Sequence, residues 1–149
     1  QFKRKIEAFD SPTPRCSVDQ TFIVILAGKS IDSMQYYYSN LFNLEKAPIM
    51  ESRIRSISKA FNLPESTKYN AAAIAIRDQC LIELDEMPKE ASERSVLQGY
   101  LSPGISIVSF KLYDRNKMIN GYESHLPNLE QSKCVIERGL NNELIELIY

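Results

Sequence analysis

The four residues Leu81–Leu84 read LIEL, and the same four letters return at Leu144–Leu147, near the end of the chain. Both copies lie in short apolar runs of the kind that forms β-strands. Side chains alternate between the two faces of a strand, so Glu83 and Asp85 share one face, and Glu146 holds the place of Glu83 in the second copy. One such stretch would carry little information, but two predict that the chain contains one structural unit twice.

The segments around the two copies follow the same order in both halves. Each half is predicted to contain a strand, a helix, a spacer and then two strands joined by a turn. The first half is the longer one because it contains an additional helix, 53–61, which Pro64 ends. The predicted strands are 21–28, 45–51, 71–77 and 80–85, then 105–113, 133–137 and 143–148, and the other predicted helices are 30–43 and 114–121.

The repeat divides the chain into four parts. Residues 1–19 carry charges, two prolines and little periodicity, which is typical of an arm or a linker. We expect a first module at 20–88, which includes the helix 53–61, and a second, shorter module at 103–149. Between them we expect a polar connector at 89–102, for which a helix is one alternative.

Composition excludes several classes of function. Of the 149 residues 44% are hydrophobic and 25% are charged, as in globular proteins, and a net charge of −1 gives no field that attracts nucleic acid or a membrane surface. No apolar run reaches the length of a membrane-spanning helix. Three widely spaced cysteines, Cys16, Cys80 and Cys134, favour a reduced, cytoplasmic protein over a disulfide framework or a zinc site. The chain begins at Gln1, which leaves open a further upstream domain.

Three stretches resemble one known family. They are SIDSMQYYYSNLFNLE at 30–45, PGISIVSFKLYD at 103–114 and VIERGLNNELIEL at 135–147. The first is similar to the first helix of the vicinal oxygen chelate superfamily, which includes glyoxalases, bleomycin-resistance proteins and extradiol dioxygenases. The second resembles the strand that opens the family's second module, and the third resembles its closing hairpin. The turn RGLNN at 138–142 departs from the family's Asp-Pro-x-Gly-Asn pattern.

The resemblance implies an α+β fold of two βαβββ modules whose mixed sheets face each other across a cleft. In metal-dependent members a histidine on the first strand and a glutamate on the last strand of each module bind one divalent ion. Here the histidine positions align with Ile23 and Ile107, which cannot bind a metal. We therefore expect neither metal nor another cofactor; Glu83 and Glu146 would be the ligands of a divalent ion if one bound.

Glu83 and Glu146 are the candidate catalytic residues of the cleft. Two carboxyl groups in one hollow would accept hydrogen bonds from an organic molecule or move a proton on it. They would equally be structural if nearby backbone amides, lysines or arginines bound them. His125, the single histidine, is the third candidate because it titrates near neutral pH, although we predict a loop around it.

Five further residues are candidate ligand contacts. Arg53 and Arg55, on the additional helix, would attract a carboxylate or phosphate, or would simply form a solvated helix face. Tyr37 belongs to a run of three tyrosines in which one ring packs inward while another lines the cleft or a subunit contact. Ser109 and Lys111 lie on the strand that opens the second module.

These observations favour a protein that binds or converts a small organic molecule, without the family metal. If it is an enzyme, enolisation or isomerisation by Glu83 is the chemistry to test, within the lyases, isomerases and dioxygenases of the superfamily. Three alternatives stay open: a module that only sequesters its ligand, a half that pairs in a homodimer or with an upstream domain, and a metal-dependent member of the same superfamily.

Overall fold

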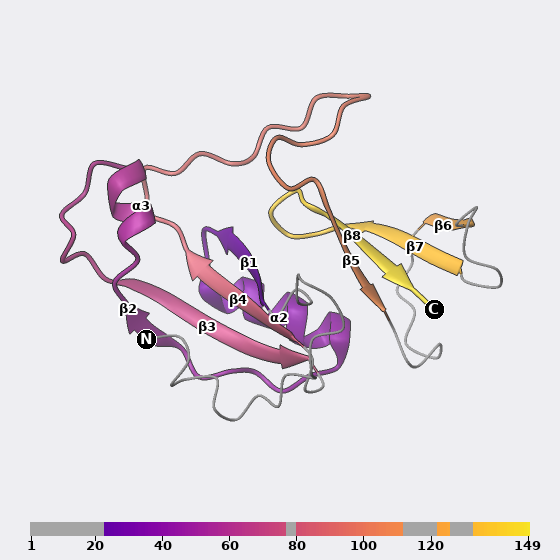
Figure 1. The fold of residues 1–149 in the computed structure, drawn as a ribbon, viewed down its shortest axis with the longest axis horizontal. Coiled ribbons are helices and arrows are strands. Elements are labelled where there is room, and N and C mark those ends of the chain that lie inside the picture. Colours follow the sequence, from indigo (N-terminus) through magenta and orange to yellow (C-terminus); the bar gives the residue numbers. More distant parts are fainter. Residues whose placement is uncertain (1–22, 77–79, 112–121, 126–132) are drawn as a thin grey trace, which may run out of the picture. The chain divides into compact units, whose positions relative to one another are not determined.

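The computed structural model describes residues 23–76, 80–111, 122–125 and 133–149, and for Tyr122–His125 and Lys133 it describes the backbone only. The chain divides between Ala91 and Ser92 into two units, and this division lies inside the segment predicted as a connector. Each unit holds one four-stranded sheet (Figure 1). None of the helices in these ranges is long and apolar enough to cross a membrane.

The first unit contains four strands and two helices in its described part. The strands are β1 (Ile23–Gly28), β2 (Met50–Ser52), β3 (Tyr69–Ile76) and β4 (Cys80–Glu86), and the helices are α2 (Ile31–Phe42) and α3 (Arg55–Ala60). The sheet order is β1-β4-β3-β2. β1 runs parallel to β4, and the other two pairs are antiparallel.

Helix α2 begins and ends where its sequence predicts. Ser30 is the N-cap, and its side chain accepts a hydrogen bond from the backbone N–H of Ser33. The carboxylate of Glu86, at the end of β4, accepts a second one from the N–H of Ile31 at 3.2 Å. At the other end Asn43 adopts a left-handed conformation with φ of 51°, which closes the helix.

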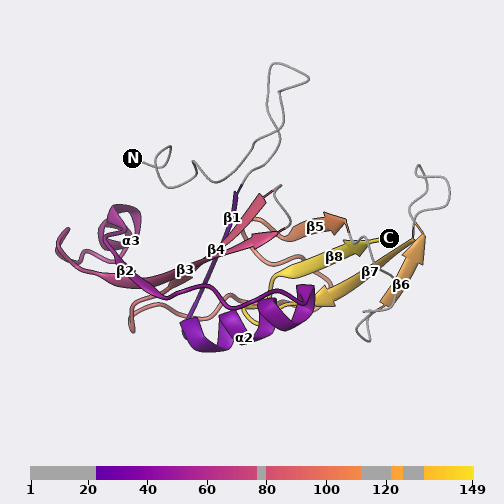
Figure 2. The same ribbon diagram turned by 90° about the horizontal axis from the view of Figure 1, so that it is seen from below.

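One face of the first sheet packs under α2. Met34 and Tyr38 of the helix are fully buried, and so are Ile82 and Leu84 of β4. The strand residues of this face alternate with the more exposed ones of the other face, as the period of two predicts. Figure 2 shows α2 on one side of the sheet and α3 on the other. The face opposite α2 carries Glu83.

The second unit contains the strands β5 (Ile107–Lys111), β6 (Tyr122–His125), β7 (Lys133–Arg138) and β8 (Leu144–Ile148). The sheet order is β5-β8-β7-β6, with β5 parallel to β8 and the other pairs antiparallel. The helix predicted at 114–121 lies outside the described residues.

The two sheets have the same topology and the same register, which confirms the repeat. In the first unit Ile23 pairs with Leu81, the first residue of LIEL; in the second Ile107 pairs with Leu144, again the first. The chain connecting the second and third strands is longer in the first unit, 53–68 against 126–132, because it contains α3. The α+β fold of two similar modules is confirmed.

Two predictions about strands were wrong. The strand predicted at 45–51 is reduced to β2, Met50–Ser52. Pro48 has no N–H to donate to a sheet, and the side chain of Gln35 bonds the carbonyl oxygen of Ala47 instead. In addition β6 was not predicted, because a four-residue strand is too short to show a period.

The segment predicted as a connector forms neither helix nor strand between Ser92 and Leu101. The backbone of this segment and the side chain of Ser102, which follows it, form hydrogen bonds with Asn142 in the turn between β7 and β8. Ser102 Oγ donates to the carbonyl oxygen of Asn142 at 3.1 Å, and Asn142 Nδ2 donates to that of Arg94 at 3.4 Å. Hydrogen bonds therefore hold this stretch to the second unit.

Candidate functional site

The face of the first sheet opposite α2 combines one half-buried carboxyl group with small side chains. Glu83 lies on β4, with Ile25 directly beside it on β1 and Ala73 beside it on β3. Ile25 is 56% exposed, and Ala73 and Ala75 are also exposed. Since the alanines carry only methyl groups, the side chains of β3 do not rise above the carboxyl group of Glu83.

Asp85 occupies the next position on the same face. Its cross-strand neighbours are Ala27 and Ala71, and its side chain is only 5% exposed. The Oδ1 atom is buried and has no hydrogen-bond partner among the residues that the structure describes. Burial, and to a smaller extent the charge of Glu83, raise the pKa of Asp85 to about 6. Two carboxyl groups of different character therefore share this face.

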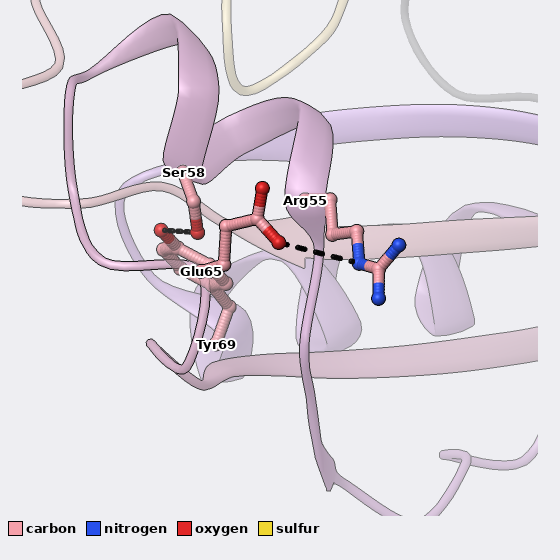
Figure 3. A network of polar contacts seen from close by, with 4 residues as sticks. All are labelled: Arg55, Ser58, Glu65 and Tyr69. Atoms are coloured by element: carbon pink, nitrogen blue, oxygen red, sulfur yellow. Dashed lines mark hydrogen bonds and ion pairs between the residues drawn. The ribbon is translucent and has the colours of Figure 1, made fainter.

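Helix α3 packs on one end of this face. The buried hydroxyl groups of Ser58 and Tyr69 form a hydrogen bond of 2.9 Å that joins α3 to the start of β3 (Figure 3). Arg55, one of the two predicted anion-binding residues, lies 3.8 Å from Glu65 in an exposed ion pair, and Arg53 is exposed just before the helix. Such exposed pairs contribute little to stability. Both arginines thus lie on the connection between β2 and β3, which meets the Glu83 face at the start of β3.

The structure does not bring Tyr37 to Glu83. Tyr37 lies on α2, which covers the opposite face of the sheet. Its ring meets that of Tyr38 edge to face, with 5.0 Å between the centroids. The predicted inward-packing ring of the triple tyrosine is Tyr38, whereas Tyr36 is exposed.

In the second unit the structure brings Glu146 together with Ser109. The two residues are direct neighbours on β8 and β5, and Ser109 Oγ donates a hydrogen bond of 2.5 Å to Glu146 Oε2. Lys111 lies on the same face of β5, two residues further on, and is exposed. Glu146 and Glu83 are equivalent in their sheets, but their neighbours on the parallel strand are a serine and an isoleucine.

The prediction that His125 lies in a loop was wrong. The backbone of His125 belongs to β6 and pairs with Lys133 of β7. The two residues end the ladder at the edge of the second sheet, on a strand that the sequence pattern did not reveal.

The residues on these faces do not fit the divalent ion that the resemblance implies for metal-dependent members. The positions aligned with the histidines, Ile23 and Ile107, lie on the same faces as the glutamates but offer no ligand atom, and neither does Ile25, beside Glu83. A carboxylate pair or a carboxylate and a hydroxyl is a poor set for zinc, nickel or iron, which favour nitrogen or sulfur. Within the described ranges no three His, Cys, Asp or Glu side chains gather in a way that could hold a metal ion.

Sequence reasoning placed Asp85 on the face of Glu83 but did not select it as a site residue. The alternation along β4 was the available signal. What distinguishes Asp85 is that it is buried without a partner for Oδ1, and burial depends on segments far away in the sequence.

No protein-family model matches this chain, and no curated protein matches it by sequence. Solved structures do resemble it. A glyoxalase family protein from Bacillus cereus is 18% identical, with a TM-score of 0.62 over 92% of this chain and 97% of that one. A glyoxylase/bleomycin resistance protein/dioxygenase domain from Frankia is 13% identical, with a TM-score of 0.58 over 89% and 98%.

A glyoxalase/dioxygenase from Nostoc punctiforme is 14% identical, with a TM-score of 0.55 over 93% of this chain and 96% of that one. At such identities the likeness concerns the fold. Together with the repeated sheet topology, these structures show that this chain has a glyoxalase-like fold.

Proposed function

We propose that the chain binds a small organic carbonyl compound on the Glu83 face of its first sheet, and that Glu83 moves a proton on it without a metal ion. The observation that carries this proposal is the position of Glu83: it lies half-buried on the face that α2 leaves uncovered, between Ile25 and the alanines of β3. A carboxylate beside apolar side chains is suited to accept a proton from a carbon next to a carbonyl group.

The second sheet supports a lesser role for Glu146. Ser109 already donates a hydrogen bond to its carboxylate, so part of its capacity to accept hydrogen bonds is used within the protein. We assign the proton transfer to Glu83 because its cross-strand neighbours, Ile25 and Ala73, are apolar.

Nuclear magnetic resonance tests both parts of the proposal. The probes are hydroxyacetone, dihydroxyacetone and 2-hydroxyacetophenone, which carry protons of the required acidity. Binding is read from the backbone amide shifts of the ¹⁵N-labelled protein, and proton transfer from the loss of the probe's α-proton signal in D₂O. We expect shifts at β1, β3 and β4, and at least a tenfold slower exchange in Glu83→Gln.

Glu51→Gln is the matched control, because Glu51 lies in an exposed ion pair with Lys68 on the first sheet. Its binding and exchange should equal those of the wild type. Binding without exchange would indicate a sequestering protein and overturn the assignment of proton transfer. Absence of shifts at β4 with all three probes would overturn the proposal as a whole.

A further inference from the structure

The second unit exposes a group of large apolar side chains, which we name the connector patch. In the described part of this unit the exposed large apolar residues are Val96, Leu97, Tyr100, Leu101, Ile105, Ile107 and Leu140. Leu97, Tyr100, Leu101 and Ile105 are each at least 63% exposed. The sequence places no charged residue between Arg94 and Lys111, although 25% of the chain is charged. The patch is therefore both apolar and free of charge along this stretch.

The segment that carries the patch has a defined conformation. Its turn at 97–100 is closed by the N–H of Tyr100, which donates to the carbonyl oxygen of Leu97 at 3.1 Å. Arg94 Nη1 donates to the carbonyl oxygen of Ile105 at 2.9 Å. The segment also runs beside the turn between β7 and β8, to which it is hydrogen-bonded (Figure 1). Polar groups of the segment thus bond within the second unit, while its apolar side chains face solvent. A surface ordered in this way loses little conformational entropy when a partner covers it.

The area of the connector patch is large for a surface that stays in water. Its side chains together expose on the order of 700–800 Å², if a fully exposed residue of this size has about 150–250 Å². The largest apolar patch of a typical monomer measures about 300–600 Å², and larger ones mark interaction sites. Each partner of a standard protein–protein interface buries about 800 Å². The patch therefore has the area that one side of a stable interface needs.

We propose that two copies of the chain associate through their connector patches. A patch without charges is complementary to itself, because apolar side chains meet apolar side chains and no like charges repel. A strongly charged partner would have to give up the hydration of its ions against this patch without gaining an opposite charge. In a twofold dimer both copies contribute the same surface, so each patch covers the other. The inference concerns the second unit and does not depend on the proposed function.

Sedimentation velocity of the full chain between about 1 and 100 µM tests the association. We expect a dimer for the wild type. A charge placed in the patch by Leu97→Asp or Leu101→Asp should raise the dissociation constant at least tenfold, because the carboxylate loses its hydration in the interface. Ile49→Asp is the matched control, since Ile49 is an exposed apolar residue of the first unit, and it should dimerise like the wild type. All three side chains are exposed, so the variants should keep the fold, as circular dichroism checks.

A photo-cross-linker identifies what covers the patch. Leu97 is replaced by p-benzoylphenylalanine, and equal amounts of ¹⁴N- and ¹⁵N-labelled chains are mixed, irradiated and analysed by mass spectrometry. We expect cross-links that join a light peptide to a heavy one, with both peptides from the second unit. Cross-links confined to single chains would show that the chain's own first unit covers the patch, and would overturn the proposal. A monomer at all concentrations, or a dimer that Leu97→Asp and Leu101→Asp leave unchanged, would overturn it as well.

Discussion

The hydroxyl group of Ser109 on β5 donates a hydrogen bond to the carboxylate of Glu146 on β8, across the parallel strand pair of the second sheet. In the first sheet the place of Ser109 is held by Ile25, which can make no such bond to Glu83. Two equivalent glutamates thus differ in their cross-strand neighbours, which are apolar beside Glu83 and include a hydroxyl group beside Glu146.

The bond between Ser109 and Glu146 should contribute modestly to stability. Because Ser109 is exposed, water replaces the lost contact, and we expect Ser109→Ala to lower the free energy of unfolding by about 0.5–1 kcal/mol. Urea denaturation followed by circular dichroism measures this change. In a Glu146→Gln background the carboxylate is absent, so Ser109→Ala should lower the free energy of unfolding by less than it does in the wild type. An equal loss in both backgrounds would contradict the pairing.

The stability of the protein should fall as the pH rises through the range in which Asp85 titrates. The folded-state pKa is about 6 and the ordinary value is 3.8, so between these values the unfolded chain releases a proton that the folded chain keeps. The resulting loss in the free energy of unfolding is absent below about pH 4 and complete above about pH 6. It amounts to roughly 3 kcal/mol, at 1.36 kcal/mol for each unit by which the pKa differs between the folded and unfolded chain.

Asp85→Asn removes this dependence. Its stability relative to the wild type should therefore increase between pH 4 and pH 7, as measured by urea denaturation at both values. A constant difference across this range would show that Asp85 titrates normally. Glu83→Gln should bring the pKa of Asp85 only part of the way back to its ordinary value, because burial is the larger cause of the shift. This pKa can be measured by titrating ¹³C-labelled aspartate carboxyl groups and following them by nuclear magnetic resonance.

Two tyrosines should respond in opposite ways to the loss of their hydroxyl groups. Tyr69→Phe breaks the buried bond to Ser58 and leaves the serine oxygen unpaired, which should cost about 1–2 kcal/mol. The hydroxyl group of Tyr38 on α2 is buried and has no hydrogen-bond partner in the described part of the chain, so Tyr38→Phe should be neutral or stabilising by up to about 1 kcal/mol. Denaturant unfolding of both variants checks the prediction, and a loss at Tyr38 as large as that at Tyr69 would refute it.

Gly139, in the turn between β7 and β8, should not tolerate a larger side chain. A Cβ atom there would collide with the side chain of Glu143, whose Oε2 is held by the backbone N–H of Asn141 at 2.9 Å. We expect Gly139→Ala to lower the free energy of unfolding by about 1–3 kcal/mol. In a Glu143→Ala background the atoms that collide are gone, so the same substitution should cost much less. An equal cost in both backgrounds would assign the effect to the backbone of Gly139 instead.

The sequence by itself determined the repeat, because the features that encode it are local. The period of two in LIEL set the faces of Glu83 and Glu146, Ser30 and Asn43 marked the ends of α2, and Pro64 limited the additional helix. Each of these signals acts within a few residues along the chain.

The tertiary structure decided which of the polar side chains have partners. Ser109 meets Glu146 from 37 residues away, and Glu86 closes the start of α2 from 55 residues away. Asp85 is buried without a partner for Oδ1, whereas Tyr37 lies on the helix that covers the other face. Burial and pairing arise only when distant segments pack together, so no local pattern could distinguish Asp85 from an ordinary aspartate at the end of a strand.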